Sequence, residues 1–415
     1  MRRNIIIILF LLWPCSAIAG LNHLLSTYGV MPPDIALSGA RTSGDAEPSA
    51  AYYNPAALAN LPNNQIALGW LYGDPSFSGG AVGDEKKYSV TNRVILLGLG
   101  LDIGRIFFKD YPLGIGLDIS IDDNGKAIMS FDDRRLPSGQ FISYGVRTIS
   151  LASGFGAQIV KGFNLGAGMM LGLSAKANLR ANTDIIGGTS EEQVFMTAQP
   201  MLAPIGSFQV VTEHVKVGGV YRGKLVGKVG PVTADATVDV GDSKLTSIPL
   251  ILAFKDGYVP QQAALGAEAM PGAVVSISAQ GEWKNWSDFD REIRRGDYAR
   301  RDADIATHDI WIPRLAVIGR PLTGLSIRGG CAFEQSPFSK IGSGTNVILD
   351  NDRTRASMGI GYQWEKISFL SHPLSIDAAF LWLHLLPRDE KTSDGREFHS
   401  DGDLFGGAAS VSLGF

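Results

Sequence analysis

Residues 405–415 read FGGAASVSLGF, and they end the chain. In an extended conformation their side chains fall into two sets: Phe405, Ala409, Val411, Leu413 and Phe415 on one face, and Ala408, Ser410, Ser412 and Gly414 on the other. A period of two with one apolar face is typical of a strand that has lipid on one side and a lumen on the other. We therefore expect an outer-membrane β-strand, whose terminal aromatic residue, Phe415, is a signal for the outer-membrane assembly machinery.

The same alternation recurs upstream. It is clearest from Leu374 to Leu386, where Ile376, Phe380 and Trp382 share a face. Weaker candidates for strands are Gln65–Tyr72, Val94–Ile103, Leu113–Ile121, Thr148–Val160, Phe163–Leu179, Val215–Val226, Val274–Trp283, Ile310–Ile318, Leu325–Phe333 and Thr354–Trp364. After the first residues no apolar run reaches the roughly 18 residues of a transmembrane helix. Because lipid offers backbone groups no hydrogen-bond partner, the remaining way to span is a closed antiparallel barrel, an all-β fold.

The N-terminus has the pattern of a secretory signal. Two arginines precede an apolar run from Ile5 to Trp13, and an Ala-x-Ala site ends at Ala19. The run is too short to span a bilayer, so we expect cleavage after residue 19 and export to the outer membrane. Pro14 stands before Cys15 where a lipoprotein signal normally has a small residue, so we do not expect lipidation.

Composition excludes several classes of function. Without Cys15 the only cysteine is Cys331, so we expect no internal disulfide and no thiol-based metal site. The 50 glycines suit many strands and turns, and a net charge of −4 gives no hint of nucleic-acid binding. No Pro/Ser-rich linker divides residues 65–415, which we expect to form one barrel domain.

The predicted connections alternate in length when counted back from Phe415. The sequence predicts long loops at 387–403, 334–353 and 285–309, and shorter turns at 365–373, 320–324 and 270–272. Bacterial barrels pair short periplasmic turns with long extracellular loops, so we expect the C-terminus in the periplasm. The count becomes ambiguous at 227–247, where one strand more or fewer would fit.

Four tryptophans lie near the ends of predicted strands. Trp283 and Trp286 flank one predicted outer loop, Trp311 closes it, and Trp364 lies near the opposite rim. These positions fit aromatic girdles at the two membrane interfaces. The alternative is that they are core tryptophans of a soluble protein.

Between the signal and the first strand lies an irregular segment, residues 20–64. It contains the small-residue run Ala36–Ala40, and later AAYYNPAAL at residues 50–58. With this Asn-Pro-Ala box the chain resembles the FadL/TodX family of outer-membrane transporters for hydrophobic compounds. Further similar stretches follow in the family's order: Glu282–Phe289, Pro313–Val317, Arg328–Gly330 and Met358–Tyr362.

The resemblance implies a barrel of about 14 strands whose lumen holds an N-terminal hatch, here residues 20–64. It also implies that Asn54, Pro55 and Ala56 take part in gating. Independently, Pro55 fixes its own backbone and restrains Asn54 to extended geometry, while the Asn54 side chain can bond nearby backbone groups. Alternatively, the box is only a turn that leads into the first strand.

The function implied by the resemblance is passive transport of hydrophobic small molecules, such as long-chain fatty acids or aromatic hydrocarbons. Substrate would be captured at the extracellular end, and hatch movement would release it laterally into the membrane. The stretch Met31-Pro32-Pro33-Asp34 departs from the family pattern, and the mature N-terminus reads Leu21-Asn22-His23-Leu24, so substrate-binding residues cannot be carried over. Glycine-rich stretches at 97–100 and 113–116 either make room for side chains in the lumen or supply a bend in the wall.

Other functions have less support in the sequence. The six histidines are scattered outside any nucleophile motif, so we expect no enzyme, cofactor or metal, although some outer-membrane barrels are acyl-hydrolases. A plugged barrel could instead serve as an interaction platform for a secretion system. We expect a monomer whose partners are a hydrophobic substrate, outer-membrane lipids, lipopolysaccharide and the assembly machinery.

Overall fold

The computed structural model describes most of the barrel and the segment before it. The described residues are 27–89, 91–107, 111–122, 149–184, 189–226, 232–240, 243–252, 258–272, 274–289, 306–340, 350–366, 372–391, 395 and 397–415. The predicted signal, residues 1–19, and the start of the predicted hatch lie outside them.

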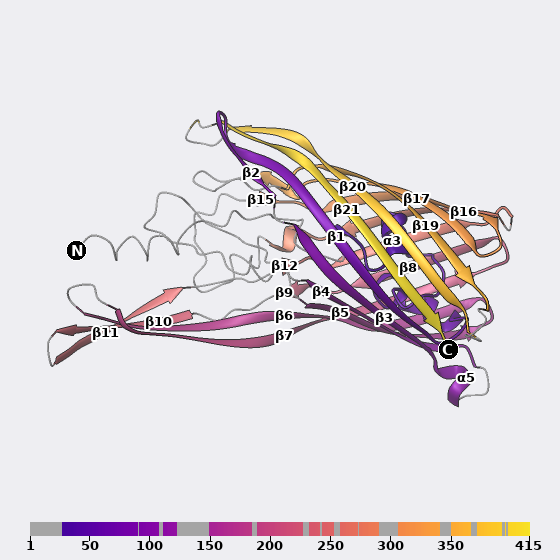
Figure 1. The fold of residues 1–415 in the computed structure, drawn as a ribbon, viewed down its shortest axis with the longest axis horizontal. Coiled ribbons are helices and arrows are strands. Elements are labelled where there is room, and N and C mark those ends of the chain that lie inside the picture. Colours follow the sequence, from indigo (N-terminus) through magenta and orange to yellow (C-terminus); the bar gives the residue numbers. More distant parts are fainter. Residues whose placement is uncertain are drawn as a thin grey trace.

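The described strands form a closed antiparallel barrel (Figure 1). Fourteen strands follow one another around the ring: β1 (Gln65–Ala81), β3 (Asn92–Asp102), β4 (Leu113–Asp122), β5 (Ile149–Val160), β6 (Phe163–Asp184), β7 (Thr189–Val211), β8 (Val215–Arg222), β13 (Gln262–Ala269), β14 (Val275–Lys284), β16 (Ile310–Leu322), β17 (Leu325–Glu334), β19 (Arg353–Trp364), β20 (Leu374–Lys391) and β21 (Glu397–Gly414). Pairing of β21 with β1, from Gly414↔Gln65 to Phe398↔Ala81, closes it. A closed ring leaves no unpaired strand edge in lipid. The prediction of a barrel is therefore confirmed.

The smaller elements gather at the ends of the barrel and inside it. They are β2 (Asp84–Tyr88), β9 (Leu225–Val226), β10 (Val232–Val240), β11 (Ser243–Leu252), β12 (Tyr258–Val259), β15 (Ala306–Thr307), β18 (Phe338–Lys340), α3 (Pro32–Ala36), α4 (Ala50–Tyr53), η1 (Pro55–Asn60) and α5 (Ile103–Phe107). Figure 1 shows β2, β10, β11 and β15 at one end, and the C-terminus with α5 at the other. Among the described residues, no helix has the length and apolarity needed to cross a membrane.

Tight turns mark the end that carries the C-terminus. Residues 161–162 join β5 to β6, and residues 323–324 join β16 to β17. Gly162 and Gly324 adopt φ of 80° and 81° in these turns, a region that favours glycine. Since bacterial barrels place their short turns in the periplasm, we name this the periplasmic end and the opposite one the extracellular end.

Side chains alternate between lipid and lumen as the sequence predicts. On β20, Ile376, Phe380 and Trp382 are exposed on the outer face, while Asp377 and Leu381 are buried on the inner face. On β21, Phe405, Val411 and the residue that follows the strand, Phe415, are exposed in the same way. The predicted faces of these two strands are therefore correct.

Of the fourteen strands of the ring, the sequence analysis did not predict two, β7 and β13. In β7, Pro204 breaks the usual pattern of a central strand. The β7–β8 ladder ends at the residue after Pro204, so the missing N–H of proline lies just beyond the ladder, where the Pro204 carbonyl still accepts a bond from Gly223 N. In β13 both faces carry small residues such as Ala264 and Ala267, which gives little hydrophobic contrast.

The predicted long loop at 387–403 is wrong. Most of this range is strand, because β20 runs to Lys391 and β21 begins at Glu397. The charged residues that suggested a loop lie at the extracellular end, where water replaces lipid and a strand can carry charge on both faces.

The tryptophans are also only partly as predicted. Trp311 is 62% exposed and Trp364 37% exposed, as an interfacial girdle requires, and Trp283 is half-buried with Nε1 bonded to Asp309. Trp286, in contrast, is buried against Tyr258 and Phe289. It belongs to a buried cluster that also contains Phe338, and it is not part of a girdle.

Lumen-facing glycines let the segment before β1 pack directly on the barrel backbone. A β-carbon at Gly166 of β6 would collide with Ala56 N, and one at Gly114 of β4 would collide with Leu58 O. On both sides of β4 the pairing runs without a register shift. The glycines therefore make room inside the lumen, and β4 shows no bulge that would bend the wall.

We expect Gly166→Val to destabilise the folded barrel by about 1–3 kcal/mol, because the new side chain must displace backbone. The control is Gly206→Val, since a β-carbon at Gly206 would have no atom within 4 Å. Thermal unfolding of the purified protein, followed by circular dichroism and by heat-dependent gel migration, measures the difference. Equal shifts for the two variants would contradict the packing described here.

Candidate functional site

The N-terminal segment, residues 27–64, lies inside the ring of strands. Its helix α3 contacts β17, β19, β20 and β21, while η1 contacts β3 to β7 on the other side of the ring. Figure 1 shows α3 within the barrel. The segment therefore bridges two opposite parts of the inner wall.

The Asn-Pro-Ala box links this segment to the wall. Asn54 is 1% exposed and extended (φ −162°, ψ 91°), as the following proline requires. Its Nδ2 donates to Thr42 O at 2.6 Å and to Phe208 O of β7 at 3.1 Å, and its Oδ1 accepts from Ala56 N at 3.1 Å. Asn54 thus caps η1, which begins at Pro55, and joins three parts of the chain.

A buried arginine, Arg222, holds the same region from β8. Its Nε donates to Tyr52 O at 2.9 Å and its Nη2 to Tyr53 O at 3.2 Å, so it satisfies carbonyls at the end of α4. The guanidinium also lies 4.5 Å from the centre of the Tyr52 ring, a cation–π distance. The sequence analysis missed this residue; the signal for it is a basic side chain on the inner face of a strand.

Side chains from the opposite wall hold the other half of the segment. Arg314 of β16 donates from Nη1 to Ser38 O at 2.6 Å and pairs through Nη2 with Glu282 at 3.1 Å. Ser357 of β19 donates from Oγ to Ala36 O at 3.1 Å. Glycines of β17 and β19 also pack closely on this half, so polar bonds and close packing on glycine hold both halves of the segment.

The segment also has its own ion pair. Asp34 is fully buried, and Arg41 Nε lies 2.9 Å from its Oδ1, while Ser49 Oγ and Met31 N donate to the two carboxyl oxygens at 3.1 and 3.0 Å. Burial raises the pKa of Asp34 to about 6, and the Arg41 guanidinium opposes that rise. The carboxylate remains ionised at neutral pH, so the pair ties α3 to residues 41–49.

The inner wall formed by β20, β21 and β1 changes in polarity along its length. Below the extracellular rim, where Ser400 is buried and the wall is polar, the inward residues other than glycine and proline are, toward the periplasmic end, Leu385, Leu383, Leu381, Ala379, Asp377 and Ser375 on β20, Leu404, Ala408, Ser410 and Ser412 on β21, and Phe77, Leu71, Ala67 and Gln65 on β1. Over this stretch all three strands pass from large apolar residues, through alanine, to polar residues. The extracellular half of the stretch below the rim is therefore apolar and its periplasmic end is polar.

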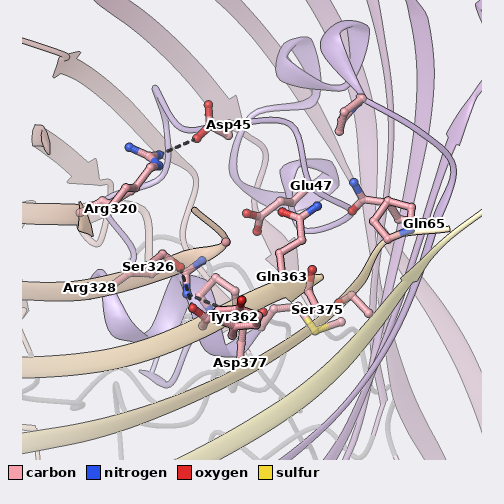
Figure 2. Close-up of a pocket in the computed structure, with 18 of the residues that line it drawn as sticks. Asp45, Glu47, Gln65, Arg320, Ser326, Arg328, Tyr362, Gln363, Ser375 and Asp377 are labelled. Carbon is pink, nitrogen blue, oxygen red and sulfur yellow. Dashed lines mark hydrogen bonds and ion pairs between the residues drawn. The ribbon is translucent and has the colours of Figure 1, made fainter. Parts of the chain in front are cut away.

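A cavity opens at the periplasmic end beneath the segment (Figure 2). Its volume is about 650 Å³, and residues 45–49 form one side of it. Arg320 Nη2 lies 3.5 Å from Asp45 Oδ2, and Arg328 Nη1 lies 2.6 Å from Asp377 Oδ1. Lys216 is a second cationic partner of Asp45. We name this cavity the periplasmic vestibule; its charged lining suits water better than hydrocarbon.

The histidines that the structure describes show no nucleophile arrangement. His384 Nδ1 lies 3.0 Å from Asp403, which also accepts from Trp382 Nε1, and His399 Nδ1 lies 2.6 Å from Asp389. Within the described ranges, neither imidazole bonds a serine hydroxyl. His384 therefore links two neighbouring strands of the wall.

Comparison with known proteins gives one relative over nearly the whole length of the chain and several solved structures with the same fold. No family model matches it. It is 28% identical over 431 residues to alkane uptake protein A of Marinobacter nauticus, a match that covers 96% of this chain and 92% of the relative.

Solved structures share the fold across nearly the whole chain. A FadL homologue of Pseudomonas aeruginosa has a TM-score of 0.59 at 14% identity, covering 93% of this chain and 98% of that one. The toluene transporter TodX of P. putida has a TM-score of 0.55 at 17% identity, covering 94% and 99%. The resemblance to the FadL/TodX family is confirmed at the level of the fold: the chain is a β-barrel with the fold of these two proteins.

We expect Arg222→Met to loosen the N-terminal segment at a cost of about 1–3 kcal/mol, because buried carbonyls of Tyr52 and Tyr53 lose their donor. Limited proteolysis of the folded barrel should then cut within residues 27–64 more readily. Arg105→Met is the control: Arg105 is largely exposed, and its guanidinium reaches Pro62 O only at 3.4 Å. It should cost less than about 1 kcal/mol. Equal cleavage of both variants and the wild type would argue against Arg222 as an anchor.

Proposed function

We propose that this protein is a passive outer-membrane transporter for hydrophobic small molecules, which it captures at the extracellular end. The observation that carries the proposal is the apolar stretch, below the extracellular rim, of the wall formed by β20, β21 and β1. Each Å² of apolar surface removed from water contributes about 25 cal/mol, so a hydrocarbon is held there without any charged contact. Solute capture needs no energy source, because transfer from water to this wall is favourable.

We propose further that residues 20–64 act as a hatch. A barrel of this width would leave an aqueous channel if it were empty. The described part of the segment contacts opposite walls, and Asn54, Pro55 and Ala56 lie where it meets β7, which supports a gating role for them. Movement of the hatch is then the step that frees the solute from the capture region.

Release into the membrane, in this proposal, is lateral. The lower wall and the periplasmic vestibule are polar, so a hydrocarbon gains nothing by continuing toward the periplasm. The bilayer core beside the barrel is its most favourable destination. Since the described pairings of β4 with β3 and β5 are continuous, a path through the wall requires movement of the hatch or of a strand.

The substrate we propose is an uncharged hydrocarbon, an alkane in the first place. The relative that spans nearly the whole chain is named an alkane uptake protein, and TodX is described as a toluene transporter. The lumen arginines Arg222 and Arg314 are already bound to carbonyls or a carboxylate, which supports an uncharged substrate over a fatty-acid carboxylate.

The proposals on export and assembly rest on the two ends of the chain. We propose that residues 1–19 are cleaved as a signal peptide and that the assembly machinery recognises the β21 terminus, where Phe415 is exposed on the outer face. We also propose that the protein functions as a monomer in contact with outer-membrane lipids and lipopolysaccharide.

Asn54→Ala is the test of the hatch. Loss of the bonds to Thr42 and Phe208 should loosen residues 42–56, and proteoliposomes that contain the variant should become leaky to small polar sugars in a swelling assay. Asn60→Ala is the matched control, because Asn60 is exposed at the end of η1. Uptake of radiolabelled n-hexadecane by cells that produce the wild-type protein tests transport itself. Tight Asn54→Ala proteoliposomes with a correctly folded barrel would contradict the hatch, and uptake no faster than in cells without the protein would contradict transport.

A further inference from the structure

A glycine-floored groove crosses the inner wall where the ring closes. Leu381 of β20 pairs with Gly406 of β21, Gly406 pairs with Gly73 of β1, and Gly73 pairs with Asn92 of β3. These four positions form one row across four strands. Its centre has no side chains, Leu381 forms an apolar end, and the Asn92 carboxamide forms a polar end.

The Tyr28 ring fills this groove. A β-carbon at Gly73 would collide with the Tyr28 ring and hydroxyl, and one at Gly406 would lie 3.6 Å from Tyr28 Cδ1 and 3.4 Å from Leu381 Cβ. Tyr28 Oη donates to Asn92 Oδ1 at 3.1 Å, and the side chain is 3% exposed. The protein's own phenol ring therefore occupies the groove.

The groove is continuous with the apolar wall. Leu383 and Leu404 are the next inward residues toward the extracellular end, and Leu71 is the next one below on β1. All of them belong with Tyr28 to one buried hydrophobic cluster. A hydrocarbon held on the apolar stretch below the extracellular rim of this wall thus lies directly above the position of the Tyr28 ring.

Two features would allow the Tyr28 ring to leave the groove: the glycine that follows it and the kind of bond that its hydroxyl makes. The next residue, Gly29, has φ of 118°, a conformation that side chains other than hydrogen rarely adopt. Rotation about Gly29 is therefore less restricted than at any residue with a β-carbon. The bond from the Tyr28 hydroxyl to Asn92 joins two uncharged groups, and water can replace such a bond at little net cost.

We propose that the Gly73–Gly406 groove is a substrate-binding site, and that Tyr28 is an internal occupant that competes with substrate and determines which solutes enter. The site takes an uncharged hydrocarbon chain or a single ring, because its occupant in the structure is one planar ring lying on glycine backbone. This inference rests on the proposed function, and it adds the location of the site and its specificity residue.

Initial uptake of radiolabelled n-hexadecane by whole cells tests the proposal. Tyr28→Ala removes the competing ring and should raise uptake about tenfold, the factor that corresponds to 1.4 kcal/mol. Adding Gly406→Leu refills the groove from the wall and should return uptake to the wild-type rate or below. Adding Gly407→Leu to Tyr28→Ala is the matched control, because Gly407 is the next residue of β21 and its β-carbon would have no atom within 4 Å. That variant should keep the raised rate.

Two further measurements separate the groove from other effects. Proteoliposomes that contain Tyr28→Ala should stay as tight to small polar sugars as the wild type; a matching rise in leakage would show a loosened hatch and overturn the proposal. Added p-cresol, which is the side chain of tyrosine as a free molecule, should lower Tyr28→Ala uptake toward the wild-type rate and leave the wild type unchanged. This measurement needs no second substitution, so it decides the matter even if the variant that carries Gly406→Leu does not fold.

The outcomes distinguish this proposal from the proposed function. If the wild type takes up no n-hexadecane, the transport function fails. If the wild type transports but Tyr28→Ala does not differ from it, or if substitutions at Gly406 and Gly407 act alike, transport stands and the groove is not its site.

Discussion

The whole structure depends on the absence of hydrogen-bond partners for the backbone in lipid. Strands can cross the membrane only if every edge is paired, and here the pairing of β1 with β21 over the full length of β1 removes the last edge. A ring of this many strands encloses more space than its own side chains fill. Closure therefore creates a second problem, an open lumen, and residues 27–64 lie in that lumen.

Two kinds of contact hold the N-terminal segment. Its backbone packs closely on lumen glycines, such as Gly166 around η1 and Gly330 around α3. Hydrogen bonds from wall side chains, such as Arg222 on one side and Arg314 on the other, add to this packing. When the segment moves, close packing loses its contacts, whereas hydrogen bonds can be exchanged in part for bonds to water. Movement of the segment therefore has to break close packing on both sides of the ring.

The sequence predicts those features whose physical cause is local. Lipid and lumen impose opposite polarities on successive residues, so the faces of β20 and β21 are visible at Phe380 or Val411 without any structure. β13 lacks that contrast. In β7 a proline, Pro204, is tolerated within a strand because the ladder with β8 ends beside it, and the sequence of β7 alone does not show where β8 ends. The restriction that Pro55 places on Asn54 is also local, so the extended backbone of Asn54 is predictable from the sequence. The bond from Asn54 to Phe208 of β7 is not predictable in this way.

The candidate site was beyond such reasoning because its parts are remote in the chain. Arg222 is 170 residues from Tyr52, and nothing in its own strand identifies the carbonyls that it binds. The Gly73–Gly406 row exists only because the first strand pairs with the last in one particular register. A shift of β1 by one residue against β21 would turn Gly73 toward lipid and put Tyr72 on the inner face beside Gly406.

The polarity of the β20–β21–β1 wall gives the lumen a direction. Transfer of a hydrocarbon from the leucine-rich half to the Ser410 and Ser412 region would expose it again to polar surface, so its free energy rises toward the periplasm. A polar solute experiences the opposite gradient. In the proposed function, the same wall therefore retains a hydrocarbon and disfavours its passage toward the periplasm. In that proposal the middle of the wall, where Gly73, Gly406 and Ala408 leave little side-chain bulk, is the lowest level that a hydrocarbon reaches before the polarity turns against it.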